Sequence, residues 1–439
     1  MAALQTLVCV IAGVIFRLWL YRSFLPEWLS TRTEIVTPVT SWERAMEGIS
    51  LKQSFISPYS GDLFHETPLM LRLLGFMSKF SQNSINLMFV AFDLVCAILL
   101  LKITKLFGGY LLVHQARSVK NYAPDVESLI LRKEDLQTIQ FFVTIAHAFN
   151  PYCIAACLAR STAIFDNMAI LFTLYYLLKG DKIMCGCFLA LSSYLTMYPL
   201  ILLAPVAIYF YQRGNPSSES YTDHKALFSY TQISLITLAW LAAFLGVSAY
   251  LEESWQFLFS TYGFTLTVPD LTPNLGVFWY FFTNMFEHFR TFFICVFQIN
   301  VIIYTVPLSI KLREHPVFLM YLLIFLIGIF KSYPSFADVG LFLCLLPLWK
   351  HVFSYMRNTF LVTCTFICST VFAPILHHLW LYAGSANANF YYAVSLAFQL
   401  AEIFLVTDLL FAFLRREYDI LHGKKHTTSD GSQGQVILD

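Results

Sequence analysis

Long apolar stretches recur along this chain and constrain its fold more than any other feature. A helix needs about 20 mainly apolar residues to cross a bilayer, because its backbone polar groups must be satisfied within the segment. The first stretch runs from about Leu4 to Tyr21, with Arg17 and Arg22 near its end, and it has no convincing basic start or cleavage site of a signal peptide. Further apolar windows cover residues 84–106, 138–158, 163–178, 183–197, 199–212, 228–250, 276–309, 317–330, 337–349, 359–378 and 390–413.

Composition supports the same fold class. Of the 439 residues, 58% are hydrophobic and only 13% are charged, which leaves too little polar surface to cover a soluble globule. We therefore predict an all-α polytopic membrane protein with about twelve transmembrane helices. We expect residues 1–422 to form a single multi-span membrane domain, with interfacial helices in the lumenal segment 23–83. The polar tail, residues 423–439, should be disordered and cytoplasmic.

Basic residues set the expected orientation. Lys and Arg gather in short cytoplasmic loops, and the even-numbered gaps between twelve spans contain most of them, including Arg132, Lys133, Arg213 and Arg313. Both termini are therefore predicted to be cytoplasmic. The net charge of +1 and the lack of a dense basic patch argue against a nucleic-acid partner.

Soluble-enzyme signatures are missing from the sequence. It contains no Walker phosphate loop, Rossmann glycine pattern, HExxH or GxSxG motif. The ten cysteines are scattered, and the pairs Cys153/Cys157 and Cys364/Cys368 lie one helical turn apart. We interpret them as small apolar helix residues rather than as metal ligands or disulfides. We expect no catalytic residue, no cofactor and no bound metal.

The first of three polar segments lies on the predicted lumenal side. It contains Ser57, Pro58, Tyr59 and Glu66, followed by Thr67-Pro68. Pro68 suits the first turn of a helix along the interface, and Thr67 could cap that helix. The residues fit a lumenal connector that covers the bundle, or a surface that takes part in binding.

The second polar segment contains Asp270 and Asn274 and leads into an aromatic run with Phe278, Trp279 and Phe282. This run could be an aromatic belt that anchors a helix among headgroups. After it come three polar side chains at helical spacings of three and four, which we expect on one helix face: Asn284, Glu287 and His288. That face would hold either an internal polar network or a polar ligand.

The third polar segment joins the last two apolar windows and contains Ser385, Asn387 and Asn389. Amide and hydroxyl groups offer donors and acceptors without charge, which suits sugar hydroxyls or phosphate oxygens, although a tight turn explains them equally well. Acidic residues inside a span should pair within the bundle or face another subunit, and we expect this of Asp93, Glu402 and Asp408.

Five stretches, found in order over nearly the whole chain, resemble the PIG-U family. They are Ser57-Pro58-Tyr59-Ser60-Gly61 with Phe64 to Leu69, Pro269 to Asn274 running into Phe278 to Phe289, Phe330 to Pro334, Tyr382 to Asn387, and Phe413 to Tyr418. This family is the phosphatidylinositol glycan class U subunit of glycosylphosphatidylinositol (GPI) transamidase. The resemblance implies a multi-pass protein of the endoplasmic reticulum membrane, with PIG-K, PIG-T, PIG-S and GPAA subunits as partners. The nucleophile would belong to PIG-K, so this chain would not be the catalyst.

The resemblance also implies candidate binding residues, because such a subunit could hold the GPI lipid near the acyl intermediate. We expect the headgroup to contact Asn387 and Asn389 first, and Ser385, Asp270, Asn274 and His288 more weakly. The acyl chains would lie against Phe278, Trp279 and Phe282, and other membrane lipids would surround the bundle. Positioning of this kind accelerates a reaction without any catalytic side chain in the chain that provides it.

A second, more distant resemblance implies a GT-C-like bundle for this chain and raises an alternative function. The Ser-Pro-Tyr element followed by Thr-Pro-Leu is similar to the first lumenal loop of the PIG-M type mannosyltransferases, which have the GT-C bundle architecture. Those enzymes carry an aspartate pair there, whereas this chain has Glu43, Arg44 and Glu47. Glu43 or Glu47 would have to act as general base for a lumenal mannosyltransferase with a dolichol-phosphate donor. A third hypothesis, a lipid transporter or flippase, predicts inverted repeats, which are not visible.

Overall fold

The protein is almost entirely helical. A computed structural model describes residues 2–215, 221 and 223–423, and no strand occurs within these ranges. This confirms the predicted all-α class, while the predicted tail, apart from Gly423, lies outside the described residues. The helices of the first half are α1 (Ala2–Leu20), α2 (Leu25–Ser30), α3 (Trp42–Gln53), α4 (Pro68–Met77), α5 (Gln82–Ser118), α6 (Lys133–Ala148), α7 (Pro151–Leu158), α8 (Ala163–Lys179), α9 (Lys182–Leu195) and α10 (Leu203–Gly214).

The second half continues the same pattern of long and short helices. They are α11 (His224–Glu252), α12 (Phe264–Thr267), α13 (Phe278–Asn284), α14 (Arg290–Ile303), α15 (Thr305–Lys311), α16 (Pro316–Phe330), α17 (Phe336–Leu345), α18 (Thr359–Leu381) and α19 (Ala388–His422). A 3-10 segment, η7 (Leu346–Tyr355), follows α17, and another, η6 (Glu287–Phe289), precedes α14.

Fewer helices reach membrane-spanning length than the sequence predicts. In the described ranges, six helical segments are long and apolar enough to cross a bilayer. The pair Thr138–Ala148 and Pro151–Leu158, bent by 41°, would make a seventh. Four shorter apolar helices accompany them, among them α1 and α16. A count of about twelve crossings therefore stays a prediction.

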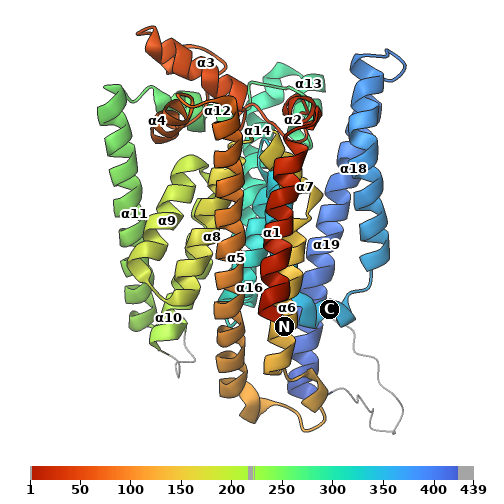
Figure 1. The fold of residues 1–439 in the computed structure, drawn as a ribbon. Helices are drawn as coiled ribbons and strands as arrows, with labels where there is room; N and C mark the ends of the chain where they lie inside the picture. Colours follow the sequence, from red (N-terminus) through yellow and green to blue (C-terminus); the bar gives the residue numbers. More distant parts are fainter. Residues whose placement is uncertain (1, 216–220, 222, 424–439) are drawn as a thin grey trace.

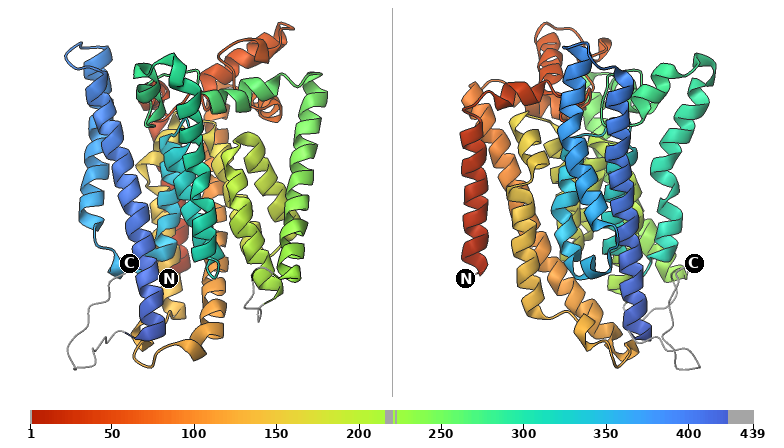
Figure 2. Two further views of the ribbon diagram at one scale, coloured as in Figure 1. Left: turned by 180° about the vertical axis from the view of Figure 1, so that it is seen from behind. Right: turned by 90° about the vertical axis from the view of Figure 1, so that its right-hand side faces the viewer.

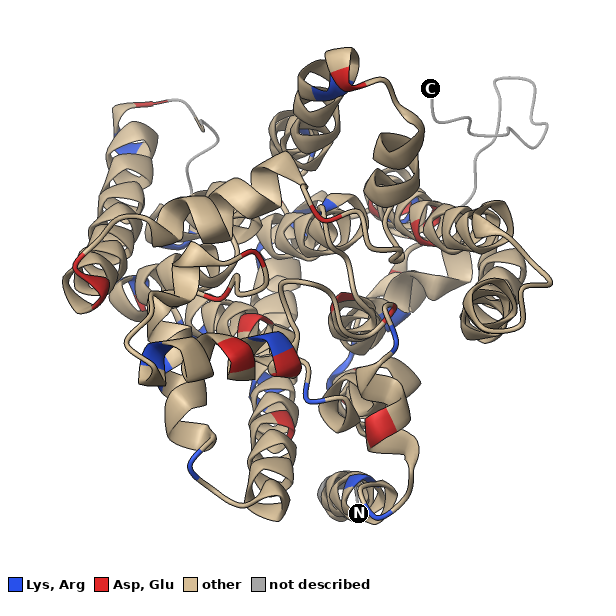
Figure 3. Cartoon of the chain, turned by 90° about the horizontal axis from the view of Figure 1, so that it is seen from above, with Lys and Arg blue, Asp and Glu red and all other residues tan. Residues whose placement is uncertain are grey.

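The long helices stand side by side, and several short ones lie at one end (Figure 1). That end carries α2, α3, α4 and α13, whereas α1 begins and α19 finishes toward the opposite end (Figures 1 and 2). The predicted lumenal segments thus share one end of the molecule. Seen from that end, most of the ribbon carries neither acidic nor basic residues (Figure 3).

The core is centred on α16, whose residues from Pro316 to Ile329 are all buried. It packs against α10, α14, α17 and α19. A helix that is apolar all round and surrounded by other helices is typical of the centre of a bundle. The bundle therefore provides a rigid support for the segments at its ends.

Two of the three acidic residues predicted to pair inside the bundle, Asp93 and Asp408, have partners there. The Arg17 guanidinium of α1 lies 2.9 Å from Asp93 of α5, and His147 of α6 lies 3.5 Å from the same carboxylate. Asp408 accepts hydrogen bonds from the backbone N–H groups of Arg357 and Asn358 at 2.9 to 3.1 Å. These contacts confirm that both aspartates have partners within the chain. All ten cysteines are free thiols.

Candidate functional site

The structure brings the three predicted polar segments together at the end that carries α3 and α13. Arg44 of α3 lies 2.9 Å from Asp270 in the second segment. Tyr280 of α13 donates a hydrogen bond to the Asn389 side chain in the third. Ser395 of α19 donates to the Asn274 carbonyl at 3.4 Å. Segments that are more than 100 residues apart in sequence therefore form one surface.

The first segment has a structural role. Ser57 accepts a hydrogen bond from the Tyr59 N–H at 3.3 Å beside the buried Pro58, and the Tyr59 hydroxyl donates to the Glu66 carbonyl at 3.1 Å. Thr162 donates to the Glu66 carboxyl at 2.5 Å. Burial raises the pKa of Glu66 to about 8, so this group stays protonated at neutral pH.

Helix α4 begins at Pro68, as predicted. Thr67 occupies the position before the helix, but its side chain makes no capping hydrogen bond. Thr67 therefore occupies the predicted cap position, but the prediction that its side chain caps the helix is wrong.

The second segment satisfies its own polar groups. Besides Arg44, the Asp270 carboxylate accepts hydrogen bonds from the Thr272 N–H, at 2.9 Å, and from the Thr272 hydroxyl. These bonds lower the pKa of Asp270, although its partial burial acts in the opposite direction. Asn274 is buried, donates to the Thr272 carbonyl at 3.1 Å and accepts from the Gly276 N–H at 2.7 Å. Both predicted headgroup residues are thus used to fold the turn.

The aromatic run packs inward. Phe278, Trp279 and Phe282 are 2%, 3% and 4% exposed, respectively. Phe278 and Phe282 belong to one cluster with Phe264 and Tyr333, and Trp279 belongs to a second cluster. These three rings contact protein on nearly all sides within this chain.

The predicted helix face with Asn284, Glu287 and His288 does not form, so this prediction is wrong. Helix α13 ends at Asn284, Met285 is extended, and Glu287 starts the separate turn η6. The break removes the spacing of three and four residues on which the prediction depended. All three side chains are exposed.

The third segment forms an exposed tip between α18 and α19. Asn387 caps α19, because its side-chain oxygen accepts the Asn389 N–H at 3.0 Å. Ser385 lies in the preceding turn, where its N–H donates to the Leu379 carbonyl at 3.0 Å. Asn387, Asn389 and Ser385 are all exposed.

Beneath this tip lies a buried polar ring that the sequence did not predict, formed around Tyr391 in the first turn of α19. The Tyr391 hydroxyl donates to the Glu34 carboxylate at 3.0 Å, and both residues are buried. The Trp279 ring centroid lies 5.9 Å from that of Tyr391, and the His377 ring of α18 lies 5.2 Å from it. Burial raises the pKa of Glu34, while Tyr391 and Arg32 act to lower it.

Three members of this ring have nitrogen atoms without a partner among the described residues. They are Nε and Nη1 of Arg32, Nε1 of Trp279 and Nδ1 of His377. Their side chains are buried, with Arg32 only 7% exposed and placed over the Trp28 ring at 4.6 Å. An unpaired buried donor costs about 1 to 3 kcal/mol. No spacing in the sequence links Arg32, Trp279 and His377, so only the packing of α18 and α19 could reveal this ring.

Guanidinium, indole and imidazole groups are hydrogen-bond donors suited to an anion such as phosphate, and exposed amides suit sugar hydroxyls.

The PIG-U family, described as GPI transamidase subunit PIG-U, matches residues 11–398. The chain belongs to the PIG-U family. It is 42% identical over 440 residues to the GPI-anchor transamidase component PIGU of Homo sapiens, with 100% of both chains covered. It is also 32% identical over 396 residues to the GPI transamidase component GAB1 of Saccharomyces cerevisiae, covering 90% of each.

The similarity to a mannosyltransferase is weaker and partial. GPI mannosyltransferase 1 of Saccharomyces cerevisiae is 29% identical over 223 residues, which is 50% of this chain and 47% of that protein. Here Glu43 and Glu47 are exposed on α3, and Arg44 between them pairs with Asp270. No group of three or more metal-ligating side chains occurs in the ranges that the structure describes.

Proposed function

We propose that this PIG-U family chain is the non-catalytic membrane subunit of a GPI transamidase that binds the GPI lipid and positions it for attachment to precursor proteins. The complex would lie in the endoplasmic reticulum membrane, with PIG-K, PIG-T, PIG-S and GPAA subunits. The end of the bundle that carries α3 and α13 would face the lumen. The exposed ethanolamine amine of the lipid would then meet the acyl intermediate held by another subunit, which is catalysis by proximity.

The observation that carries this proposal is the ring of unpaired buried nitrogen atoms directly below an exposed tip of amides. Arg32, Trp279 and His377 offer donors to the phosphate of a phosphoinositol-glycan. Asn387 and Asn389, at the tip, offer amide N–H groups to its sugars. Buried donors are rarely left unpaired in native proteins, so a ligand that accepts these hydrogen bonds provides a physical reason for the arrangement.

The acyl chains would need an apolar surface that reaches the lipid. Phe278 and Phe282 are buried and would support this surface from behind. Exposed aromatic side chains follow them in the chain, namely Phe286, Phe289 and Phe292, which are 80%, 50% and 63% exposed. Apolar side chains that remain exposed at a membrane-facing surface are suited to lipid contact. His288 and Ser385 would lie at the rim of this surface.

The proposal is tested by replacing the amides at the tip. Cells that lack the endogenous gene would express the full chain with Asn387→Ser and Asn389→Ala, and surface display of a GPI-anchored reporter would be measured. Serine keeps the cap of α19, because it accepts the same N–H, so assembly should be unchanged. We expect GPI attachment to fall about tenfold, the effect of losing two hydrogen bonds.

A matched control is Asn358→Ala, which changes an asparagine at the opposite end of α18. It should leave both attachment and assembly unchanged. Normal attachment by the double variant, with equal amounts of assembled complex, would remove the tip from the binding site.

A further inference from the structure

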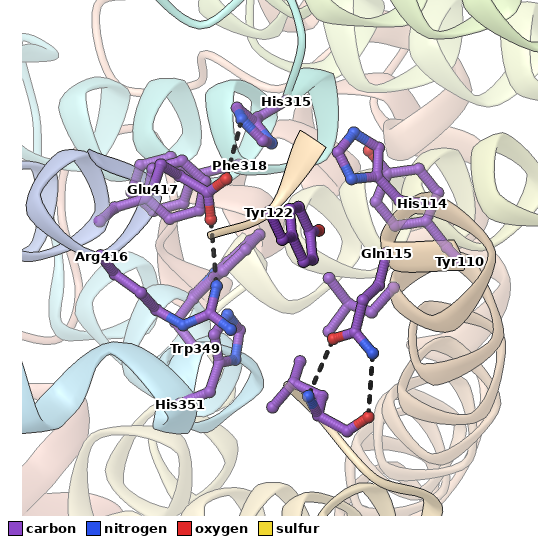
Figure 4. A pocket seen from close by; sticks show the side chains of 13 residues that line it. Tyr110, His114, Gln115, Tyr122, His315, Phe318, Trp349, His351, Arg416 and Glu417 are labelled. Carbon is purple, nitrogen blue, oxygen red and sulfur yellow. Dashed lines mark hydrogen bonds and ion pairs between the residues drawn. The ribbon is translucent and has the colours of Figure 1, made fainter. Parts of the chain in front are cut away.

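A cavity lies at the other end of the bundle, away from the ring and the tip. The space between its walls, including the solvent-filled mouth, has a volume of about 490 Å³. Figure 4 shows its walls, which come from five parts of the chain. They are the last turns of α5 with Tyr110 and His114, the following loop with Tyr122, His315 before α16, η7 with Trp349 and His351, and the last turns of α19 with Arg416 and Glu417.

The cavity lies at the depth where lipid headgroups would be. His315 immediately precedes α16, and Trp349 follows α17, so both stand at the edge of the apolar core. The apolar window of α5 ends near residue 106, and His114 lies about 12 Å further along the helix. A pocket formed by helix ends at this level is accessible to the headgroups of one leaflet.

The charges of the pocket are balanced. The Arg416 guanidinium lies 3.0 Å from the Glu417 carboxylate and donates to the Leu129 carbonyl at 2.8 Å. The other Glu417 oxygen faces His315 at 3.6 Å (Figure 4). Burial and the nearby Arg416 lower the pKa of His315 to about 4, so it is neutral at physiological pH. One cation beside one anion suits a ligand that carries both signs of charge.

Two nitrogen atoms of the lining have no partner in the described part of the chain. They are Nε1 of Trp349, whose side chain is only 2% exposed, and Nδ1 of His351. The two rings lie 6.0 Å apart, and both side chains line the cavity. A buried indole N–H in the wall of a cavity is a hydrogen-bond donor without an acceptor. A phosphate oxygen at this place would satisfy it.

Aromatic rings form much of the remaining wall. Trp349 packs edge-on against Phe318 and Phe413, with centroids 4.7 and 5.9 Å away. Tyr110 and Tyr122 line the side that includes His114. Aromatic faces next to a carboxylate hold alkylammonium groups through cation–π attraction.

We propose that this pocket binds a zwitterionic phosphate ester, the headgroup of phosphatidylcholine in the adjacent leaflet. The phosphate accepts hydrogen bonds from Trp349 and His351 beside Arg416. The ammonium lies against the aromatic wall and Glu417. This site is separate from the GPI site proposed above, and it does not depend on it.

The test measures the lipid that stays with the protein. The full chain would be purified in a mild detergent, exposed to equal amounts of phosphatidylcholine and phosphatidylglycerol, washed and analysed by mass spectrometry. Wild-type protein should retain phosphatidylcholine preferentially. The double variant Trp349→Phe with His351→Leu keeps apolar volume and removes both nitrogen atoms, so phosphatidylcholine retention should fall about fivefold. Trp240→Phe, a change at a partly exposed tryptophan of α11, is the matched control and should have no effect.

A single variant and a competition experiment test the site even if the double variant does not fold. Glu417→Gln keeps an acceptor for Arg416 but removes the negative charge, so the preference for phosphatidylcholine over phosphatidylglycerol should disappear. Soluble phosphocholine should compete only weakly, because it lacks the acyl chains. Unchanged lipid retention in the variants would overturn the site. Equal binding of both lipids by wild-type protein would overturn its zwitterion preference, and full competition by phosphocholine would replace the lipid with a soluble ester.

Discussion

Two neighbouring regions at one end of the molecule differ in whether their polar groups have hydrogen-bond partners within the chain. The turn from residues 268 to 276 uses Asp270 and Asn274 for hydrogen bonds within the chain, and both side chains have partners there. The ring around Tyr391 keeps unpaired nitrogen atoms on Arg32, Trp279 and His377, although these side chains are more deeply buried than Asp270.

This difference distinguishes residues that stabilise the fold from residues that can bind a ligand. A polar group with hydrogen-bond partners in the chain stabilises the fold and has few free hydrogen-bonding positions for a ligand. A buried donor without a partner destabilises the fold unless a ligand supplies an acceptor. Asp270 and Asn274 are therefore expected to affect stability. Arg32, Trp279 and His377 are expected to affect lipid binding, and each substitution below tests one side of this comparison.

Arg32→Met should have the largest effect on function. It keeps an apolar stem and removes the charged donors together with the guanidinium that lies over the Trp28 ring. Hydrogen bonds to charged groups contribute about 1.5 to 3 kcal/mol. We expect GPI attachment to fall about tenfold to a hundredfold, measured as surface display of a GPI-anchored reporter at equal amounts of assembled complex. Arg32→Lys should restore part of the activity. Full activity of the Met variant would contradict the phosphate assignment.

Asn274→Ala should lower stability rather than binding. It removes two side-chain hydrogen bonds of a buried amide, and the groups left unpaired cost about 1 to 3 kcal/mol. The melting temperature of the purified chain should drop, while attachment per folded molecule should stay unchanged. If attachment per folded molecule fell instead, Asn274 would be a lipid-binding residue rather than a residue that stabilises the turn.

Trp279→Phe should have a smaller functional effect than Arg32→Met. Phenylalanine keeps the aromatic contacts with Tyr391 and Trp380 and removes only the indole N–H. A neutral hydrogen bond is worth about 1 kcal/mol, or roughly fivefold in affinity. Retention of GPI lipid by the purified chain would measure it. The matched change Trp240→Phe on α11 should leave retention unaltered.

Glu66→Gln should have the smallest effect on GPI attachment and should instead change how stability depends on pH. The folded-state pKa of Glu66 is raised to about 8, so the unfolded chain releases this proton at a lower pH than the folded chain does. Stability therefore decreases as the pH rises between about 4.5 and 8. Glutamine cannot ionise, so the melting temperature of the variant should decrease less over this range. Parallel pH curves for both proteins would show that Glu66 is ionised in the folded state.

The sequence by itself determined the helical membrane class and the family, because apolar length and ordered motifs are local properties of the chain. It also located the start of α4 at Pro68 and the three polar segments. It misplaced Asn284, Glu287 and His288, since the break at Met285 depends on packing that no helical spacing records. Only the tertiary structure decided which polar groups are already satisfied. Arg32, Trp279 and His377 come from three distant segments and meet because α13, α18 and the loop after α2 pack around Tyr391.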